Sequence, residues 1–131
     1  RPTIVTWHRP TFSRGYHGDQ TDTSSLWNLV SADKDVKLVL WGHDHNYEQV
    51  ERTVQTGTTT EHKVNTIVVG TGGADLRKCS TPNISGELIC GKKNNYGVLQ
   101  LKLEANGYSW SYRNANGKKL GRQLDSGRVN F

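Results

Sequence analysis

Histidine is the residue type whose placement in this sequence points most clearly to chemistry. The chain has five histidines. Four of them stand at the end of a predicted strand or in the loop that follows one: His8, His17, His43 and His45. Neutral imidazole is a common ligand for zinc, iron and similar ions, and α/β sheets place their active sites at the carboxyl ends of strands. The placement therefore predicts a site built largely from imidazoles.

The most specific pattern is a His-x-His pair. The mostly apolar run Val36–Trp41 predicts a buried strand, and Gly42, His43 and His45 follow it. Glycine permits a sharp turn where a β-carbon would clash, and residues i and i+2 of an extended chain point the same way. Such a pair also occurs as two surface histidines in a turn. Its position after a buried strand and a glycine favours two rings that converge on one ion or flank two neighbouring ions.

A second strand should deliver another imidazole to the same place. The β-branched run Thr3–Trp7 predicts a buried strand that ends at His8. Because strand, helix and strand follow in order, this run and Val36–Trp41 should form a parallel pair. His8 is then expected beside His43 and His45.

The helix between the two strands is predicted from a cap and an apolar periodicity. The hydroxyl residues Thr23–Ser25 form an N-cap signal before an apolar run. Leu26, Leu29 and Val30 share the i, i+3, i+4 spacing of one helical face. These three side chains are therefore expected on one apolar face of a helix that ends at Asp33–Asp35.

The second half of the chain reads as an antiparallel meander. Strand-like runs and turn signals follow one another from residue 47 onward: Tyr47–Val54 (weak), Val64–Val69, Gly97–Leu103, the turn Asn106-Gly107, Tyr108–Tyr112 and the turn Asn116-Gly117. Residues 1–131 are therefore predicted to form a single unit of the α/β class, in which a βαβ unit is followed by an antiparallel meander.

Composition indicates that the core is thin. Hydrophobic residues make up 33% of the chain and the mean hydropathy is −0.72, which is low for a globular domain. Methionine is absent and the first residue is Arg1. We expect the chain to be part of a larger unit.

The charge balance narrows the classes of partner. Seventeen basic and twelve acidic residues give a net charge of +5 without a polybasic arm. The charge fits either a solvated surface or a field that attracts anions such as phosphate esters. No apolar stretch approaches the roughly 20 residues of a membrane span, and basic and aromatic residues do not alternate as on a nucleic-acid platform. Neither a membrane nor a nucleic acid is expected as a partner.

Cys79 and Cys90 lie in a loop-like region that contains the glycosylation sequon Asn83-Ile84-Ser85. The two cysteines fit a disulfide or two free thiols. A disulfide together with glycosylation at Asn83 favours an oxidising, extracellular or periplasmic setting.

Several sequence blocks resemble the calcineurin-like metallophosphoesterases in their purple-acid-phosphatase form. Val5–His8 with Arg9-Pro10 is similar to the fourth motif block of that family, and Gly42–Glu48 is similar to its last metal-binding block. Gly70–Gly73 and Tyr96–Leu101 resemble its C-terminal segment. The resemblance covers nearly the whole chain. It implies the C-terminal half of a metallophosphoesterase β-sandwich flanked by helices.

The resemblance also implies roles. His8 and His43 would bind one metal ion and His45 a second, with iron, zinc and manganese as candidates. His17 would contact the substrate phosphate and protonate the leaving group. The plant enzymes carry a second histidine beside it, where this chain has Gly18.

The family's earlier blocks, which supply an Asp, a bridging Asp and an Asn, are missing here. Asp19 lacks their sequence context, and His62 matches no motif and is expected in solvent. Two ions about 3.5–4 Å apart repel one another unless an anionic ligand bridges them. The isolated chain should therefore bind metal weakly and hydrolyse little.

Three hypotheses of function follow. The first is metal-dependent hydrolysis of phosphate esters, once an N-terminal half completes the site. The second is a catalytically silent fragment or binding module of the same fold. The third is a domain with one structural zinc ion, although such sites usually take four ligands, often cysteines, and both cysteines here lie far from the histidines in sequence. Because Ile4–Trp7 and Val36–Trp41 would lack packing partners in a fragment, we expect pairing with the missing half or a homodimer.

Overall fold

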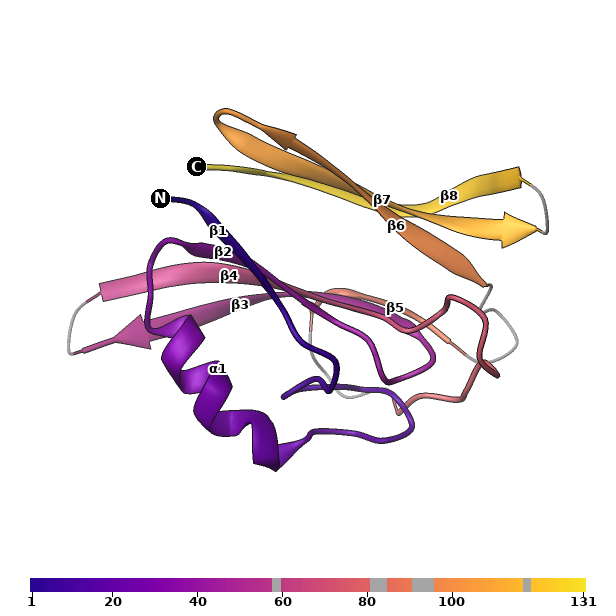
Figure 1. The fold of residues 1–131 in the computed structure, drawn as a ribbon, viewed down its shortest axis with the longest axis horizontal. Coiled ribbons are helices and arrows are strands. Elements are labelled where there is room, and N and C mark those ends of the chain that lie inside the picture. Colours follow the sequence, from indigo (N-terminus) through magenta and orange to yellow (C-terminus); the bar gives the residue numbers. More distant parts are fainter. Residues whose placement is uncertain (58–59, 81–84, 91–95, 117–118) are drawn as a thin grey trace.

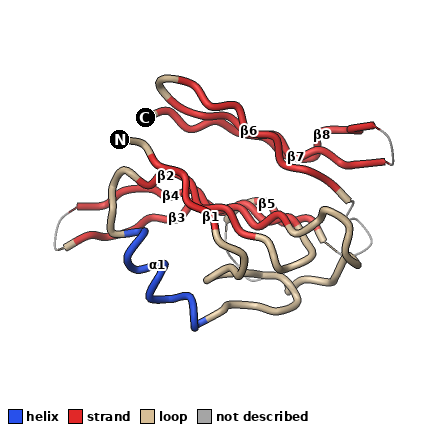
Figure 2. The backbone as a smooth tube through the Cα atoms, in the orientation of Figure 1, coloured by secondary structure: helices blue, strands red, loops and turns tan. Residues whose placement is uncertain are grey.

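Two β-sheets pack face to face, and one helix covers the outer face of the larger sheet (Figure 1). This computed structural model describes residues 1–131 except 58–59, 81–84, 91–95 and 117–118. The tube view separates the strand layers from the loops that gather at one end of the larger sheet (Figure 2). These loops include the segments that carry His8, His17, His43 and His45.

The larger sheet has five strands in the order β1-β2-β4-β3-β5. Their bounds are β1 Thr3–Thr6, β2 Val36–Trp41, β3 Tyr47–Thr56, β4 Thr60–Val69 and β5 Glu87–Ile89. The smaller sheet is the meander β6 Gly97–Glu104, β7 Gly107–Asn116 and β8 Lys119–Asn130. A 3₁₀ turn at Thr21–Thr23 leads into the helix α1, Ser24–Ser31.

The strand–helix–strand prediction is confirmed. β1 and β2 are parallel, with Ile4 opposite Leu38, and α1 lies between them in the chain. β2 is also parallel to β4, whereas β3 pairs with β4 and β5 in antiparallel fashion. The mixed α/β class, with a βαβ unit followed by an antiparallel meander, is therefore correct.

The core between the two sheets is aromatic at its centre. Tyr47 of β3 and Tyr112 of β7 stack with ring centroids 4.1 Å apart and planes 10° from parallel. The buried members of this core are Leu38, Tyr47, Ile67, Tyr108 and Tyr112. The meander thus packs over the centre of one face of the larger sheet.

The other face of the larger sheet packs against α1 and the loop before it. The buried members of this second core are Trp27, Val36, Val39, Trp41, Val64 and Val68. Because β2 is covered on both faces, the expectation that Val36–Trp41 lacks packing partners is wrong. Each fully buried side chain of this size contributes about 1.5–3 kcal/mol relative to its exposed state.

The predicted apolar face of α1 is only partly correct. Leu26 and Leu29 are 40% and 74% exposed, whereas Trp27 and Ser31 are buried. The indole of Trp27 packs edge-on against Phe12, at 5.3 Å between ring centroids, and this large aromatic contact sets the rotation of the helix. Among the described residues, no helix has the length and hydropathy needed to span a membrane.

Two further predictions, the turns of the meander and the exposure of His62, can be compared with the structure. β6 and β7 meet at a tight turn, with Glu104 opposite Gly107, close to the predicted turn. The second predicted turn, at Asn116-Gly117, extends into residues outside those described. His62 lies in β4 opposite Val54, and both of its ring nitrogens are buried. Its expected exposure to solvent is therefore wrong.

Candidate functional site

The four histidines predicted from sequence line one hollow of about 430 Å³. It lies where β1, β2 and β4 end and the loops begin. Its other lining residues are small or apolar: Gly42, Val69, Gly70, Gly72, Gly73 and Ala74. The topology has therefore brought together four imidazoles from two loops, and the loop after β4 closes the hollow.

His43 occupies the centre of this group. Its ring centroid lies 5.2 Å from that of His8 and 4.5 Å from that of His17. The backbone N–H of Gly42 donates to the carbonyl of His8 at 3.0 Å. The pairing of β1 with β2 thus continues to the histidines and fixes His8 beside His43.

The turn that carries the pair differs from the predicted one. His43 has φ +63°, in the left-handed region, whereas Gly42 has no positive φ. The expectation of an extended His-x-His segment turned by Gly42 is wrong, because the reversal occurs at His43 itself. A residue other than glycine in this region costs on the order of 1–3 kcal/mol and persists only where surrounding contacts enforce it.

His45 is oriented by the loop after β4. Its Nδ1 lies 2.7 Å from the carbonyl oxygen of Asp75, and its own carbonyl accepts the N–H of Arg77 at 3.3 Å. A hydrogen bond to the Asp75 carbonyl requires the proton on Nδ1, so the lone pair of the neutral ring is then on Nε2. Histidines that ligate metals are commonly oriented by such a bond.

Electrostatics keep His43 in its neutral form. Burial lowers the pKa of the His43 imidazole below its usual value, and protonation of His17 or His8 would lower it further. The opposing effect of the Asp44 carboxylate is smaller. His43 is therefore a lone-pair donor near neutral pH.

The donor set does not fit a two-metal centre. No carboxylate lines the hollow. In the described part of the chain, no group of three or more His, Cys, Asp or Glu side chains is arranged to hold an ion. A bridging carboxylate would be needed to offset the repulsion between two cations. The metal-ligand roles of His8, His43 and His45, and the catalytic role of His17, remain predictions.

Sequence reasoning missed the buried network beneath the histidine loop. Glu48 of β3 accepts the backbone N–H of Arg14 at 2.8 Å and forms an ion pair with the Arg14 guanidinium, 3.4 Å from Nε. Burial raises the pKa of the Glu48 carboxyl, although Arg14 opposes the rise. A signal was present, because Glu48 falls on the sheet face that also carries Val50.

A disulfide joins the segment after β4 to the residue that follows β5. Cys79 and Cys90 are joined, with Cα atoms 6.0 Å apart. The N–H of Ser80 donates to the carbonyl of Arg14 at 2.9 Å. The bridge thus anchors the segment that orients His45. Asn83 lies outside the described residues.

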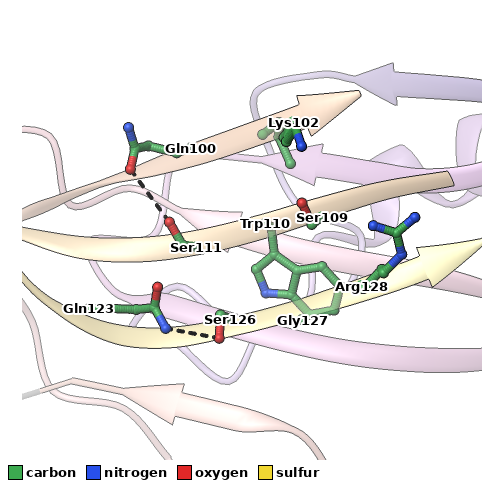
Figure 3. Close-up of a pocket in the computed structure, with 10 residues that line it drawn as sticks. Gln100, Lys102, Ser109, Trp110, Ser111, Gln123, Ser126, Gly127 and Arg128 are labelled. Carbon is green, nitrogen blue, oxygen red and sulfur yellow. Dashed lines mark hydrogen bonds between the residues drawn. The ribbon is translucent and has the colours of Figure 1, made fainter. Parts of the chain in front are cut away.

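A larger hollow, of about 630 Å³, lies on the smaller sheet and shares no residue with the histidine site (Figure 3). Its polar side chains are engaged with neighbours. Gln123 donates to Ser126 within the lining, and Lys102 and Arg128 form ion pairs with Glu104, which does not line the hollow. This hollow holds no group with catalytic or ligand character, so the chemistry points to the smaller one.

Comparison with protein-family models and with curated proteins finds no match. The fold is similar to that of the solved structure of GAP50, described as the anchor in the inner membrane complex of Plasmodium. The TM-score is 0.69 at 21% sequence identity. The match covers 97% of this chain and 36% of that one. A likeness at this identity shows the fold alone.

These comparisons correct one expectation. The identification of the chain as the C-terminal half of a calcineurin-like metallophosphoesterase of the purple-acid-phosphatase type is wrong, because no family model matches and the similar structure belongs to an anchor protein. The short motifs described the fold correctly. A fold hosts many functions, so it does not carry the activity with it.

Proposed function

We propose that this chain is a catalytically silent binding module. It presents a cluster of imidazoles at one end of its larger sheet and needs donors from another polypeptide segment to complete a site. The observation that carries this proposal is the composition of the hollow, which has four histidines and no carboxylate.

The chemistry of these donors sets the class of ligand. Burial and the neighbouring histidines lower the pKa of His43 and favour its neutral form, and the bond to Asp75 fixes the orientation of the His45 ring. Neutral imidazole nitrogens suit divalent transition ions such as zinc or nickel, whereas magnesium and calcium prefer oxygen. The module would therefore contribute nitrogen ligands to an ion shared with carboxylates from elsewhere.

The comparison supports the silent module better than a hydrolase. The similar fold belongs to a protein described as an anchor. This chain matches 36% of that protein's length, which is consistent with a module that acts together with further chain or with a partner.

The test is a paired assay on the chain by itself. Imidazole resonances are recorded by NMR during addition of Zn²⁺, and hydrolysis of 4-nitrophenyl phosphate is measured with zinc, manganese or iron present. We expect the resonances of His8, His17, His43 and His45 to shift with fast exchange, and hydrolysis to stay at the level of the metal ions alone. Metal-dependent turnover that disappears in His43→Asn would refute the proposal.

A second candidate function is hydrolysis of phosphate esters after completion by a partner segment. The observation that favours it is the position of His17, whose ring is exposed in the loop beside His43 and could meet an anionic substrate. Activity that appears only when a carboxylate-bearing partner is added, and that is lost in His17→Ala, would support this candidate.

A further inference from the structure

The residue between the two histidines of the pair does not face the hollow. Asp44 is completely buried and is absent from the residues that line it. A buried carboxylate without hydrogen bonds is strongly unfavourable, so its partners are informative.

Those partners all belong to the loop that carries His17. The Oδ1 of Asp44 accepts the backbone N–H of His17 at 2.9 Å, and its Oδ2 accepts the hydroxyl of Ser13. The same Ser13 oxygen accepts the N–H of Gly15 at 2.9 Å. The loop is thus wrapped around one carboxylate, through hydrogen bonds that its charge strengthens.

Close packing around Asp44 reinforces these bonds. A β-carbon on Gly15 would lie 2.4 Å from Asp44 Cγ, and one on Gly70 would lie 1.9 Å from the Asp44 carbonyl oxygen. Both contacts are far shorter than van der Waals distance. The loop that contains Gly15 and the loop that begins at Gly70 therefore both pack directly against Asp44.

We propose that Asp44 is a positioning residue: its buried carboxylate holds the Ser13–His17 loop so that the His17 ring lies against His43. The geometric claim stands on these contacts, and its importance for binding rests on the function proposed above. In this arrangement the turn at His43 has a second use, because it directs the next side chain inward while the two histidines reach the hollow.

Asp19 is the competing explanation for the shape of the loop. Its Oδ1 accepts the N–H of Ser13 at 2.8 Å. Asp19 belongs to the same loop, however, so this bond closes the loop on itself. Within the described residues, the bond to Asp44 is what joins the backbone of His17 to the segment that carries His43.

The experiment measures the contact between the two rings without any metal. NMR cross-relaxation between the imidazole protons of His17 and His43 is compared in the wild type, Asp44→Ala, Asp44→Asn and the control Asp19→Ala, with near-ultraviolet circular dichroism as the check on folding. We expect the cross-peak to be lost in Asp44→Ala and kept in Asp19→Ala. Asp44→Asn should keep it, since its amide oxygen can accept from His17 while its NH₂ donates to Ser13.

A cross-peak that persists in a folded Asp44→Ala overturns the proposal. So does a cross-peak that is lost in Asp19→Ala but kept in Asp44→Ala, or one that is lost in a folded Asp44→Asn. If Asp44→Ala does not fold, Ser13→Ala decides, because it keeps the bond to His17 but removes the hydroxyl that bridges to Gly15. A weaker cross-peak then supports the proposal and an unchanged one refutes it. The result is independent of cation binding, so failure of the proposed function and failure of this inference are separate outcomes.

Discussion

The imidazole ring of His17 lies 4.5 Å from that of His43, centroid to centroid, although the two residues come from different loops. If both rings at this distance were in the positively charged imidazolium form, they would repel one another. Together with burial, this repulsion lowers the pKa of His43. The proximity therefore links the geometry of the site to the pH dependence of folding.

The first prediction concerns that dependence. Because the folded-state pKa of His43 is lowered, the unfolded chain binds more protons below about pH 6.5, and stability falls as the pH drops from there towards the folded-state pKa. Above that window His43 has no effect. Urea unfolding at about pH 7.5 and about pH 5.5 should show a loss of stability that is smaller in His43→Asn, which tolerates the left-handed backbone. The same pH slope in both proteins would contradict the assignment.

The buried ion pair gives the second prediction. Arg14→Ala removes the ion-pair partner of the buried Glu48 carboxylate but leaves the Coulombic attraction of Arg52 in place. Loss of one partner of a buried pair costs up to roughly 3–5 kcal/mol. The matched control is Lys63→Ala, since Lys63 and Glu51 form an ion pair that is exposed, and such pairs contribute about 1 kcal/mol or less. Equal losses in urea unfolding would show that the Arg14–Glu48 contact is not buried in solution.

The third prediction concerns the close approach of β7 to β8. A β-carbon on Gly127 would lie 2.1 Å from the Trp110 ring, whereas one on Gly72 would meet nothing within 4 Å. Overpacking of this kind costs about 1–3 kcal/mol, so Gly127→Ala should lower the melting temperature and Gly72→Ala should leave it nearly unchanged. A similar effect of both substitutions would argue against the register that places Trp110 opposite Gly127.

The disulfide gives the fourth prediction. The bridge spans 11 positions of sequence, and closing a loop of this size stabilises the fold by about 3 kcal/mol in the chain-entropy model. Cys79→Ser combined with Cys90→Ser should therefore lower the free energy of unfolding and broaden the His45 resonance, because the segment that carries Asp75 loses its anchor. An unchanged His45 resonance would show that the disulfide does not help to orient His45.

Much of the fold could be predicted because its signals are local. The apolar run Val36–Trp41 and the turn near Asn106 specify their elements through burial and turn chemistry. β8 escaped prediction because Lys119–Asn130 is mostly polar and becomes a strand through pairing with β7. The rotation of α1 escaped because it depends on where the Trp27 indole packs, which is a tertiary contact.

Some features of the candidate site could likewise be predicted from local sequence signals, and others could not. That four histidines meet at one end of the sheet follows from strand order, which the sequence pattern indicates. The reversal at His43 and the inward direction of Asp44 could not be predicted, because the alternation rule assumes an extended chain. The sheet face of Glu48 could be inferred from its spacing to Val50, but its ion pair could not, because Arg14 comes from a distant loop.

Calorimetric titration of the chain with Zn²⁺ tests most directly whether this module supplies part of a site or all of it. We predict weak binding of at most one ion per chain, reduced further in His43→Asn and unaffected by His62→Asn, since His62 lies away from the hollow. Tight binding of two ions per chain would contradict the account.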